Sequence, residues 1–265
     1  MKGILFASFG STYDGARARD IDGTARAVFA AFPGALQAQA YTSSVVRRRL
    51  AERGVEVPSA AQALERMADA GCTEVTVQPG HFLPGEEYGK LLREASSQAH
   101  RFSGLRMGAP LLATPADLAE VVRIVEARFP QEDGRGIVLM GHGSETFSNA
   151  VYAALDYAFK ETGRPDIHVG AVEGYPHLHN VAKMIGACGY TSLLLAPLML
   201  VAGDHATNDM AGDGMDSWAQ VLSMAGYGVS CHLEGLGALA PVREMFTSHA
   251  LAARPISTVP APAAR

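Results

Sequence analysis

The sequence predicts an α/β fold with two similar lobes, each a parallel sheet flanked by helices, and a cleft between the lobes. The first observation is an internal repeat: residues 3–11 recur at 136–144, and the apolar segment 73–85 is matched by 191–203. The second is that strand-like and helix-like segments alternate in each copy, which is typical of parallel sheets because parallel strands need crossover connections. Equivalent strand ends that differ between the copies are the places to look for chemistry, and several of these differences are histidines.

The repeat divides the chain into two lobes. Residues 1–130 form the predicted N-terminal lobe and residues 136–253 the predicted C-terminal lobe. The remaining residues, 254–265, are rich in Pro and Ala and lack apolar content, so we expect a disordered tail. A length of 265 residues is sufficient for two small domains with separate cores.

Apolar periodicity places the elements of the first lobe. Short apolar runs indicate buried strands, and apolar residues spaced by three or four indicate helices. The predicted strands are 3–7, 36–41, 74–78 and 105–108. The predicted helices are 15–32, 45–53, 60–70 and a segment from the Thr114-Pro115 start to about Phe129.

The second lobe repeats this plan. Its predicted strands are 137–140, 167–171, 192–195 and 229–233. Its predicted helices are 148–162, 178–188 and 241–251.

Composition excludes several classes of function. A net charge of −5 and a pI near 6.0 argue against nucleic acid as a partner, which requires clustered cations. The longest apolar run, 193–203, is too short to span a membrane, and the N-terminus has no export-signal pattern. Three widely spaced cysteines fit reduced thiols, so we expect a cytoplasmic protein. The loop at Gly10 lacks the lysine and spacing of nucleotide-binding motifs, so no nucleotide is expected.

Three polar residues in the second lobe follow predicted strands. His142 follows strand 137–140, Glu173 follows the next strand, and His205 lies shortly after the third. Because the carboxyl ends of parallel strands lie at one edge of a sheet, these side chains could converge. Two imidazoles and a carboxylate suit a divalent ion such as cobalt, iron, nickel or zinc. The alternative is that each histidine is a hydrogen-bonded loop residue.

The first lobe has a counterpart of the loop that carries His205. In the segment 79–88 the repeat sets Glu87 opposite His205, and His81 lies in the same loop. Glu87 could handle protons near a bound metal. The alternative is a helix N-terminal turn, in which acidic side chains favour the helix dipole.

Several motifs resemble the anaerobic-pathway sirohydrochlorin cobaltochelatases, which belong to the class II, ATP-independent chelatases. The resemblance runs from Lys2 to about Leu251, and its longest motif is residues 197–211. The shorter motifs are Ser8-Phe9-Gly10-Ser11, Thr42-Ser43, Met140-Gly141-His142-Gly143 and Val169-Gly170-Ala171-Val172-Glu173.

The resemblance implies a tetrapyrrole site and residue roles. It implies that His142, Glu173 and His205 bind the metal and that His142 also accepts a proton, which suits imidazole chemistry. With Glu87 assigned to proton shuttling, the expected activity is insertion of Co²⁺ into sirohydrochlorin. The expected substrate-binding residues, taken from the short motifs and the His81 loop, are Phe9, Gly10, Ser11, Thr42, Ser43 and His81.

Other interpretations stay open at this point. Fe²⁺ or Ni²⁺ suits the same donor atoms, and Fe²⁺ insertion would serve sirohaem synthesis. A zinc hydrolase could use the same three ligands to activate water. A non-catalytic tetrapyrrole carrier would bind its cargo and release it unchanged. A homo-oligomer, formed through an exposed helix face, is also open.

Overall fold

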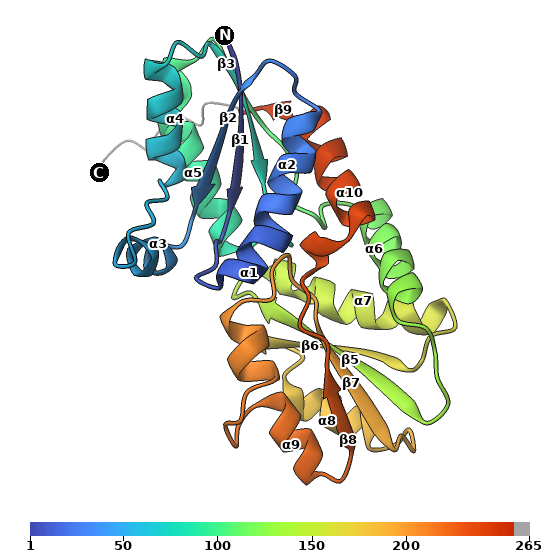
Figure 1. Ribbon diagram of the computed structural model, residues 1–265. Helices are drawn as coiled ribbons and strands as arrows, with labels where there is room; N and C mark the ends of the chain where they lie inside the picture. The colour runs from blue at the N-terminus through green and yellow to red at the C-terminus, as the bar shows by residue number, and fades with distance from the viewer. Residues whose placement is uncertain (257–265) are drawn as a thin grey trace, which may run out of the picture. The chain divides into compact units, whose positions relative to one another are not determined.

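The computed structural model describes residues 1–256, which divide into two compact units (Figure 1). Unit 1 comprises residues 1–10, 24–111 and the chain from Arg243, and unit 2 comprises residues 11–23 and 112–242. Each unit has one mainly parallel sheet flanked by helices. The predicted fold class, two similar α/β units, is confirmed.

The sheet of unit 1 has the strand order β2-β1-β3-β4-β9, with β9 antiparallel to β4 and the other pairs parallel. The strand at Lys2–Ser8 is buried from Gly3 onward, which explains its nearly continuous apolar sequence. The strands are β1 (Lys2–Ser8), β2 (Leu36–Tyr41), β3 (Glu74–Pro79), β4 (Gly104–Met107) and β9 (Arg254–Pro255).

Helices cover both faces of this sheet. Figure 1 shows α4 and α5 on one face, and α2 and α10 on the other. Ser59 begins α4 with a reciprocal capping box to Gln62, a signal that is readable in the sequence. The helices associated with this unit are α2 (Asp22–Ala30), α3 (Ser44–Ala51), α4 (Ala60–Asp69), α5 (Glu86–Gln98) and α10 (Ala240–Leu251), with a 3₁₀ turn at Ala99–Arg101.

Unit 2 has a four-stranded parallel sheet with the order β6-β5-β7-β8. Figure 1 shows α7 on one face, and α8 and α9 on the other. The strands are β5 (Arg135–Gly143), β6 (Ile167–Glu173), β7 (Ser192–Pro197) and β8 (Gly228–Cys231). The helices are α1 (Asp14–Ala16), α6 (Pro115–Arg128), α7 (Ala150–Glu161), α8 (Leu178–Ile185) and α9 (Trp218–Met224). Shorter helical segments lie at Arg17–Ile21, Phe147–Asn149, His205–Met210 and Leu236–Ala238.

The two units differ from the predicted continuous lobes, 1–130 and 136–253, in two places. The segment 11–23 belongs to unit 2, because the buried Asp20 side chain accepts hydrogen bonds from the backbone of that unit. Most of α10 returns to unit 1, where the Phe246 ring is fully buried and meets Phe6 edge to face at 6.2 Å. The chain therefore passes between the units more often than a simple repeat predicts.

Some predicted boundaries were also wrong. The single helix expected at 15–32 is divided into α1, a π-helical segment and α2. The disordered tail was predicted to begin at Arg254, but Arg254 and Pro255 form β9 beside β4, with Ile256 donating a backbone hydrogen bond to Leu105. Residues 257–265 lie outside the described part of the chain, so that part of the tail stays a prediction. Helices α5 and α9 were not predicted as elements.

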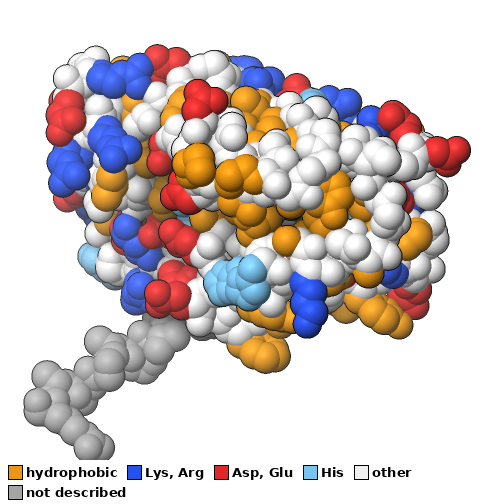
Figure 2. Space-filling model, turned by 90° about the horizontal axis from the view of Figure 1, so that it is seen from below, with side chains coloured by type: hydrophobic (Ala, Val, Ile, Leu, Met, Phe, Trp, Pro, Cys, Tyr) orange, Lys and Arg blue, Asp and Glu red, His pale blue; other side chains and the backbone are white. Residues whose placement is uncertain are grey.

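Surface charge, helix length and the cysteines are relevant to the expected partners and location of the protein. Figure 2 shows Lys, Arg, Asp and Glu side chains interspersed on one face of the molecule. No helix in residues 1–256 combines the length and the apolar character needed to cross a membrane. Of the three cysteines, which all have free thiols, Cys72 is buried, whereas Cys188 and Cys231 are exposed. The expected cytoplasmic location stays a prediction.

Candidate metal centre

The predicted metal ligands lie at one edge of the unit 2 sheet, at the ends of β5 and β6 and at the start of the helical segment after β7. β5 is flanked by β6 and β7, and Gly143 of β5 is paired in register with Glu173 of β6. His142 therefore lies next to the strand that ends in Glu173. His205 begins the π-helical segment that follows β7 on the other side of β5. The strand order itself explains how residues distant in sequence meet at this edge.

The structure brings these three side chains together. Each of His142, Glu173 and His205 offers one ligand atom, and these atoms lie within 4.8 Å of one another. The two imidazole rings are perpendicular, with centroids 4.7 Å apart, and His142 Nδ1 lies 3.8 Å from Glu173 Oε2. Ligand atoms around one ion, with bonds of about 2.1 Å, are separated by about 3–4 Å. Small side-chain rotations are therefore sufficient to hold a divalent ion.

The centre is partly open to solvent. The side chains of His142, Glu173 and His205 are 38%, 64% and 28% exposed. A structural metal site is normally closed by four protein ligands, whereas a reactive one keeps open positions. Three ligands with this exposure leave room for an additional, external ligand.

The glycines beside His142 are required by close contacts. Gly143 has φ +102°, and a Cβ atom there would lie 1.5 Å from the Glu173 carbonyl oxygen. A Cβ atom at Gly141 would lie 2.1 Å from the Tyr152 ring. These contacts allow β5 and β6 to approach closely at the end of the sheet, which fixes the separation of two ligands.

Tyr152 supports the same turn through its buried side chain. Its side chain is fully buried, and its hydroxyl accepts a hydrogen bond from the Gly143 backbone N–H at 3.2 Å. Burial raises the pKa of Tyr152 to about 12, so the phenol stays neutral at physiological pH. Tyr152 therefore positions the His142 turn without adding a charge to the metal centre.

Asp209 orients His205. Its Oδ2 lies 2.6 Å from His205 Nδ1. Because an ionised carboxylate only accepts hydrogen bonds, Nδ1 carries the proton and Nε2 keeps the lone pair for a metal. A carboxylate bound to the second nitrogen of a ligand histidine is a recurrent support of metal sites.

We expect Asp209→Ala to weaken Co²⁺ binding about 10- to 100-fold, because the His205 ring loses its orientation and its tautomer preference. The Co²⁺ affinity of Asp209→Asn should lie between those of Asp209→Ala and the wild type, since its amide oxygen still accepts the hydrogen bond. Isothermal titration calorimetry with Co²⁺ measures the affinity. Asp213→Ala, which removes an exposed acid from the following loop, is the matched control. Equal affinities for the Asp209 and Asp213 variants would contradict this role.

A buried carboxylate that the sequence analysis missed holds the start of the His205 loop. Asp20 is fully buried, and its Oδ2 accepts hydrogen bonds from the backbone N–H groups of Ala202, at 3.1 Å, and Gly235, at 3.2 Å. Arg19 binds both Asp20 oxygens, at 2.7 and 3.1 Å. Asp20 therefore joins the segment 11–23 to the loop that carries His205.

Tyr13 and Ser11 also contact this loop. The Tyr13 hydroxyl donates to Asp204 Oδ1 at 3.1 Å and accepts from Asn208 Nδ2 at 3.3 Å. A Cβ atom at Gly203 would lie 3.3 Å from Ser11 Oγ. Ser11, predicted to bind substrate, is thus buried against the backbone of the His205 loop.

The other predicted substrate residues lie in unit 1. Thr42 and Ser43 are buried, and the Ser43 side chain caps α3 by accepting the Val46 N–H at 3.2 Å. Gly10 has φ +98° and lies against the Tyr41 ring, whereas Phe9 is 37% exposed. The substrate roles of these residues stay predictions.

His81 is buried in unit 1, with Nε2 3.4 Å from Thr42 Oγ1. Burial, with a smaller contribution from the Lys90 charge, lowers the pKa of His81 to about 4. His81 is therefore a neutral ring at physiological pH. Its predicted contact with substrate would have to be a neutral hydrogen bond.

The lowered pKa of His81 predicts acid sensitivity. The unfolded chain binds a proton near pH 6.5 and the folded chain only near pH 4, so the stabilisation is complete above pH 6.5 and is lost as pH falls toward 4. We expect this residue to reduce the free energy of unfolding by about 2 kcal/mol between pH 7.5 and pH 5. Urea unfolding of the wild type and His81→Asn at both pH values measures it. The same pH dependence in both proteins would refute this explanation.

Glu87 occupies the first turn of α5, together with Glu86. Its Oε2 lies 3.9 Å from Lys90 Nζ and, among the described residues, accepts no hydrogen bond although it is shielded from solvent. Lys90 Nζ also donates to the Thr42 carbonyl oxygen. The placement fits the helix N-terminal turn that was considered for Glu87, and it leaves one carboxylate oxygen able to accept a proton.

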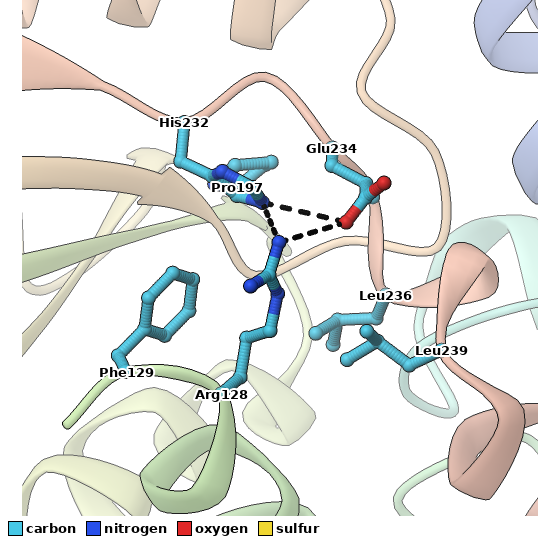
Figure 3. Close-up of a pocket in the computed structure, with 8 residues that line it drawn as sticks. Arg128, Phe129, Pro197, His232, Glu234, Leu236 and Leu239 are labelled. Atoms are coloured by element: carbon cyan, nitrogen blue, oxygen red, sulfur yellow. Dashed lines mark hydrogen bonds and ion pairs between the residues drawn. The ribbon is translucent and has the colours of Figure 1, made fainter.

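A second polar cluster in unit 2 is already satisfied internally (Figure 3). Arg128 Nη2 lies 3.1 Å from both His232 Nε2 and Glu234 Oε2. Burial and the Arg128 charge lower the pKa of His232. The guanidinium thus binds the imidazole nitrogen and the carboxylate oxygen that a metal would need. The cluster also joins the end of α6 to the segment after β8.

Comparison with known proteins identifies the family of the chain. The sequence pattern described as "Cobalt chelatase (CbiK)" matches residues 2–254. This chain belongs to the CbiK cobalt chelatase family. The predicted family is therefore confirmed, and the chain is a metal chelatase.

Two related proteins agree with this assignment, and one solved structure agrees with the fold. The sirohydrochlorin cobaltochelatase of Salmonella typhimurium is 35% identical over 250 residues, which are 94% of each chain. The sirohydrochlorin cobaltochelatase CbiKC of Nitratidesulfovibrio vulgaris is 34% identical over 233 residues, 85% of this chain and 80% of that protein. The structure of SirB from Bacillus subtilis with Fe³⁺ shows the same fold as this CbiK family member, with a TM-score of 0.63 at 15% identity, covering 94% of this chain and 93% of that one.

Proposed function

We propose that this CbiK family member inserts Co²⁺ into sirohydrochlorin in anaerobic cobalamin biosynthesis. The observation that carries the proposal is the cluster of His142, Glu173 and His205, whose ligand atoms lie within 4.8 Å of one another. Two imidazoles and a carboxylate bind a borderline divalent ion and leave coordination positions for nitrogen atoms of a macrocycle. The two relatives above are both named sirohydrochlorin cobaltochelatases.

The balance of the reaction defines what the residues do. One Co²⁺ enters the macrocycle and two pyrrole N–H protons leave, so net charge is conserved and no electrons move. Because no phosphate bond is broken, ATP is not required. His142 accepts a proton from the macrocycle, and Glu173 offsets the charge of the ion while it is held. His205, fixed by Asp209, acts as a ligand only.

The proposal extends to Glu87 as a proton shuttle. We expect Glu87→Gln to lower kcat about tenfold or more while Co²⁺ affinity is retained, because the amide cannot accept a proton. Glu86→Gln removes the same charge from the same helix turn and is the matched control. Steady-state kinetics with Co²⁺ titrations measures both effects. If the two variants have the same kcat, Glu87 has no role beyond the helix terminus.

One assay tests the function directly. Purified protein is mixed anaerobically with sirohydrochlorin and Co²⁺, and macrocycle absorption is followed against a protein-free control. We expect faster conversion with protein and no dependence on ATP. Binding without conversion would instead indicate a carrier, and neither binding nor conversion would exclude the tetrapyrrole function. Insertion rates measured in parallel for Co²⁺, Fe²⁺ and Ni²⁺ identify the preferred metal. A clear preference for Fe²⁺ would indicate a role in sirohaem synthesis instead of cobalamin synthesis.

A further inference from the structure

The two loops that follow His142 and Glu173 each expose a large aromatic side chain. Phe147 is 93% exposed, the highest value among the exposed large hydrophobic side chains of the described residues. Tyr175, two residues after Glu173, is 60% exposed. Burial of such rings is favourable, so they offer unused binding free energy beside the metal centre.

These two loops are joined to each other by Asn149. Its Oδ1 accepts the Ser144 backbone N–H at 3.0 Å, and its Nδ2 donates to the Tyr175 carbonyl oxygen at 2.5 Å. Gly174 has φ +128°, and a Cβ atom there would lie 2.6 Å from Asn149 Oδ1. The side chain of Asn149 therefore fixes the loop after β5 against the loop after β6.

Hydroxyl groups hold the loop of Phe147 in a defined conformation. Ser144 Oγ lies 2.9 Å from Thr146 Oγ1, which lies 2.6 Å from Ser148 Oγ. The Thr146 backbone N–H also donates to Ser144 Oγ at 3.1 Å. Phe147 is thus exposed on a hydrogen-bonded loop, at the same sheet edge as the open metal ligands.

We propose that Phe147 and Tyr175 form an aromatic platform that contacts the flat tetrapyrrole macrocycle during metal insertion. This inference depends on the proposed function. A conjugated macrocycle offers π faces and apolar edges that pack against aromatic rings. A macrocycle that reaches an ion held by His142 and Glu173 must come close to the loops that immediately follow them. The platform supplies binding energy that does not depend on the metal.

Single exposed hydrophobic side chains are common, so the test needs a matched control. Tyr157 is 69% exposed but lies within α7, away from the loop ends. Comparable exposed rings are removed by Phe147→Ala, by Tyr175→Ala, by the double variant and by the control Tyr157→Ala. Tyr175→Phe keeps the ring and loses only the hydroxyl.

The measurement is the affinity of the metal-free protein for sirohydrochlorin, followed by quenching of protein fluorescence or by the macrocycle spectrum. We expect about a tenfold weaker affinity for each alanine variant of the platform and about a hundredfold for the double variant. Tyr157→Ala and Tyr175→Phe should bind as the wild type does. Co²⁺ affinity and the thermal midpoint should be unchanged in every variant.

Three outcomes separate the inference from the proposed function. If the platform variants bind sirohydrochlorin as tightly as Tyr157→Ala, the inference is overturned while metal insertion by the wild type still supports the proposed function. If wild-type protein binds the macrocycle through the platform but inserts no metal, the proposed function fails and the platform is retained. If wild-type protein binds no sirohydrochlorin at all, both fail.

Discussion

Replacing His142 with alanine should reduce the rate of Co²⁺ insertion about a thousandfold or more. The change removes one of the three proposed metal ligands and, in the proposed reaction, the group that accepts a macrocycle proton. Proton transfer by a positioned side chain alone typically contributes about 10²- to 10⁴-fold. We expect no large change in fold, because the His142 side chain is 38% exposed and the turn is held by Gly143 and Tyr152.

The control for this variant is His179→Ala, which removes an exposed histidine from the same unit. Anaerobic conversion assays, with circular dichroism to verify folding, give the rates. His179→Ala should retain activity within about twofold, since surface substitutions have small effects. A His142→Ala protein that converts sirohydrochlorin at the rate of His179→Ala would remove His142 from the mechanism.

Replacing Gly143 with alanine should abolish Co²⁺ binding and lower the free energy of unfolding by about 3 kcal/mol or more. The φ of +102° is unfavourable for alanine, and the added Cβ atom would lie 1.5 Å from the Glu173 carbonyl oxygen. That contact cannot be relieved by a side-chain rotation, because the backbone fixes the position of Cβ and the oxygen belongs to the backbone. The ends of β5 and β6 would have to separate, and His142 and Glu173 with them.

Gly163→Ala separates the steric effect from the conformational one. Gly163 has φ +87°, but an added Cβ atom would meet no heavy atom within 4 Å. This control should therefore lose only about 1 kcal/mol and bind Co²⁺ normally. Urea unfolding and Co²⁺ titration of both variants measure the difference. Normal Co²⁺ binding by Gly143→Ala would show that the close approach of the two strands is not needed.

The clustering of His142, Glu173 and His205 could be predicted from sequence, because these residues follow predicted strands of a parallel sheet. A histidine or glutamate directly after a buried apolar run can be placed at the sheet edge without any knowledge of side-chain contacts. The internal repeat predicted the two α/β units, because strand-like and helix-like segments alternate in each copy. What the repeat could not supply was the path of the chain between them.

The supporting residues were not predictable in the same way. Asp20 lies in an Arg-Ala-Arg-Asp segment that is typical of a solvated helix face, and only the structure shows its contacts with Ala202 and Gly235. The contact of Asp209 with His205 was easier to predict than those of Asp20, because a spacing of four residues places two side chains on one helical face. Phe246 likewise gives no local signal that α10 packs in unit 1, since burial against Phe6 is a long-range contact.

In the proposed reaction, His142, Glu173 and His205 hold a single divalent ion. Anomalous diffraction at the cobalt edge, from crystals of the protein loaded with one equivalent of Co²⁺, tests it most directly. We predict one strong peak about 2.0–2.2 Å from a nitrogen of each imidazole and from a Glu173 oxygen. A fully occupied cobalt peak elsewhere on the protein, with no density among these three side chains, would show that they do not form the metal site.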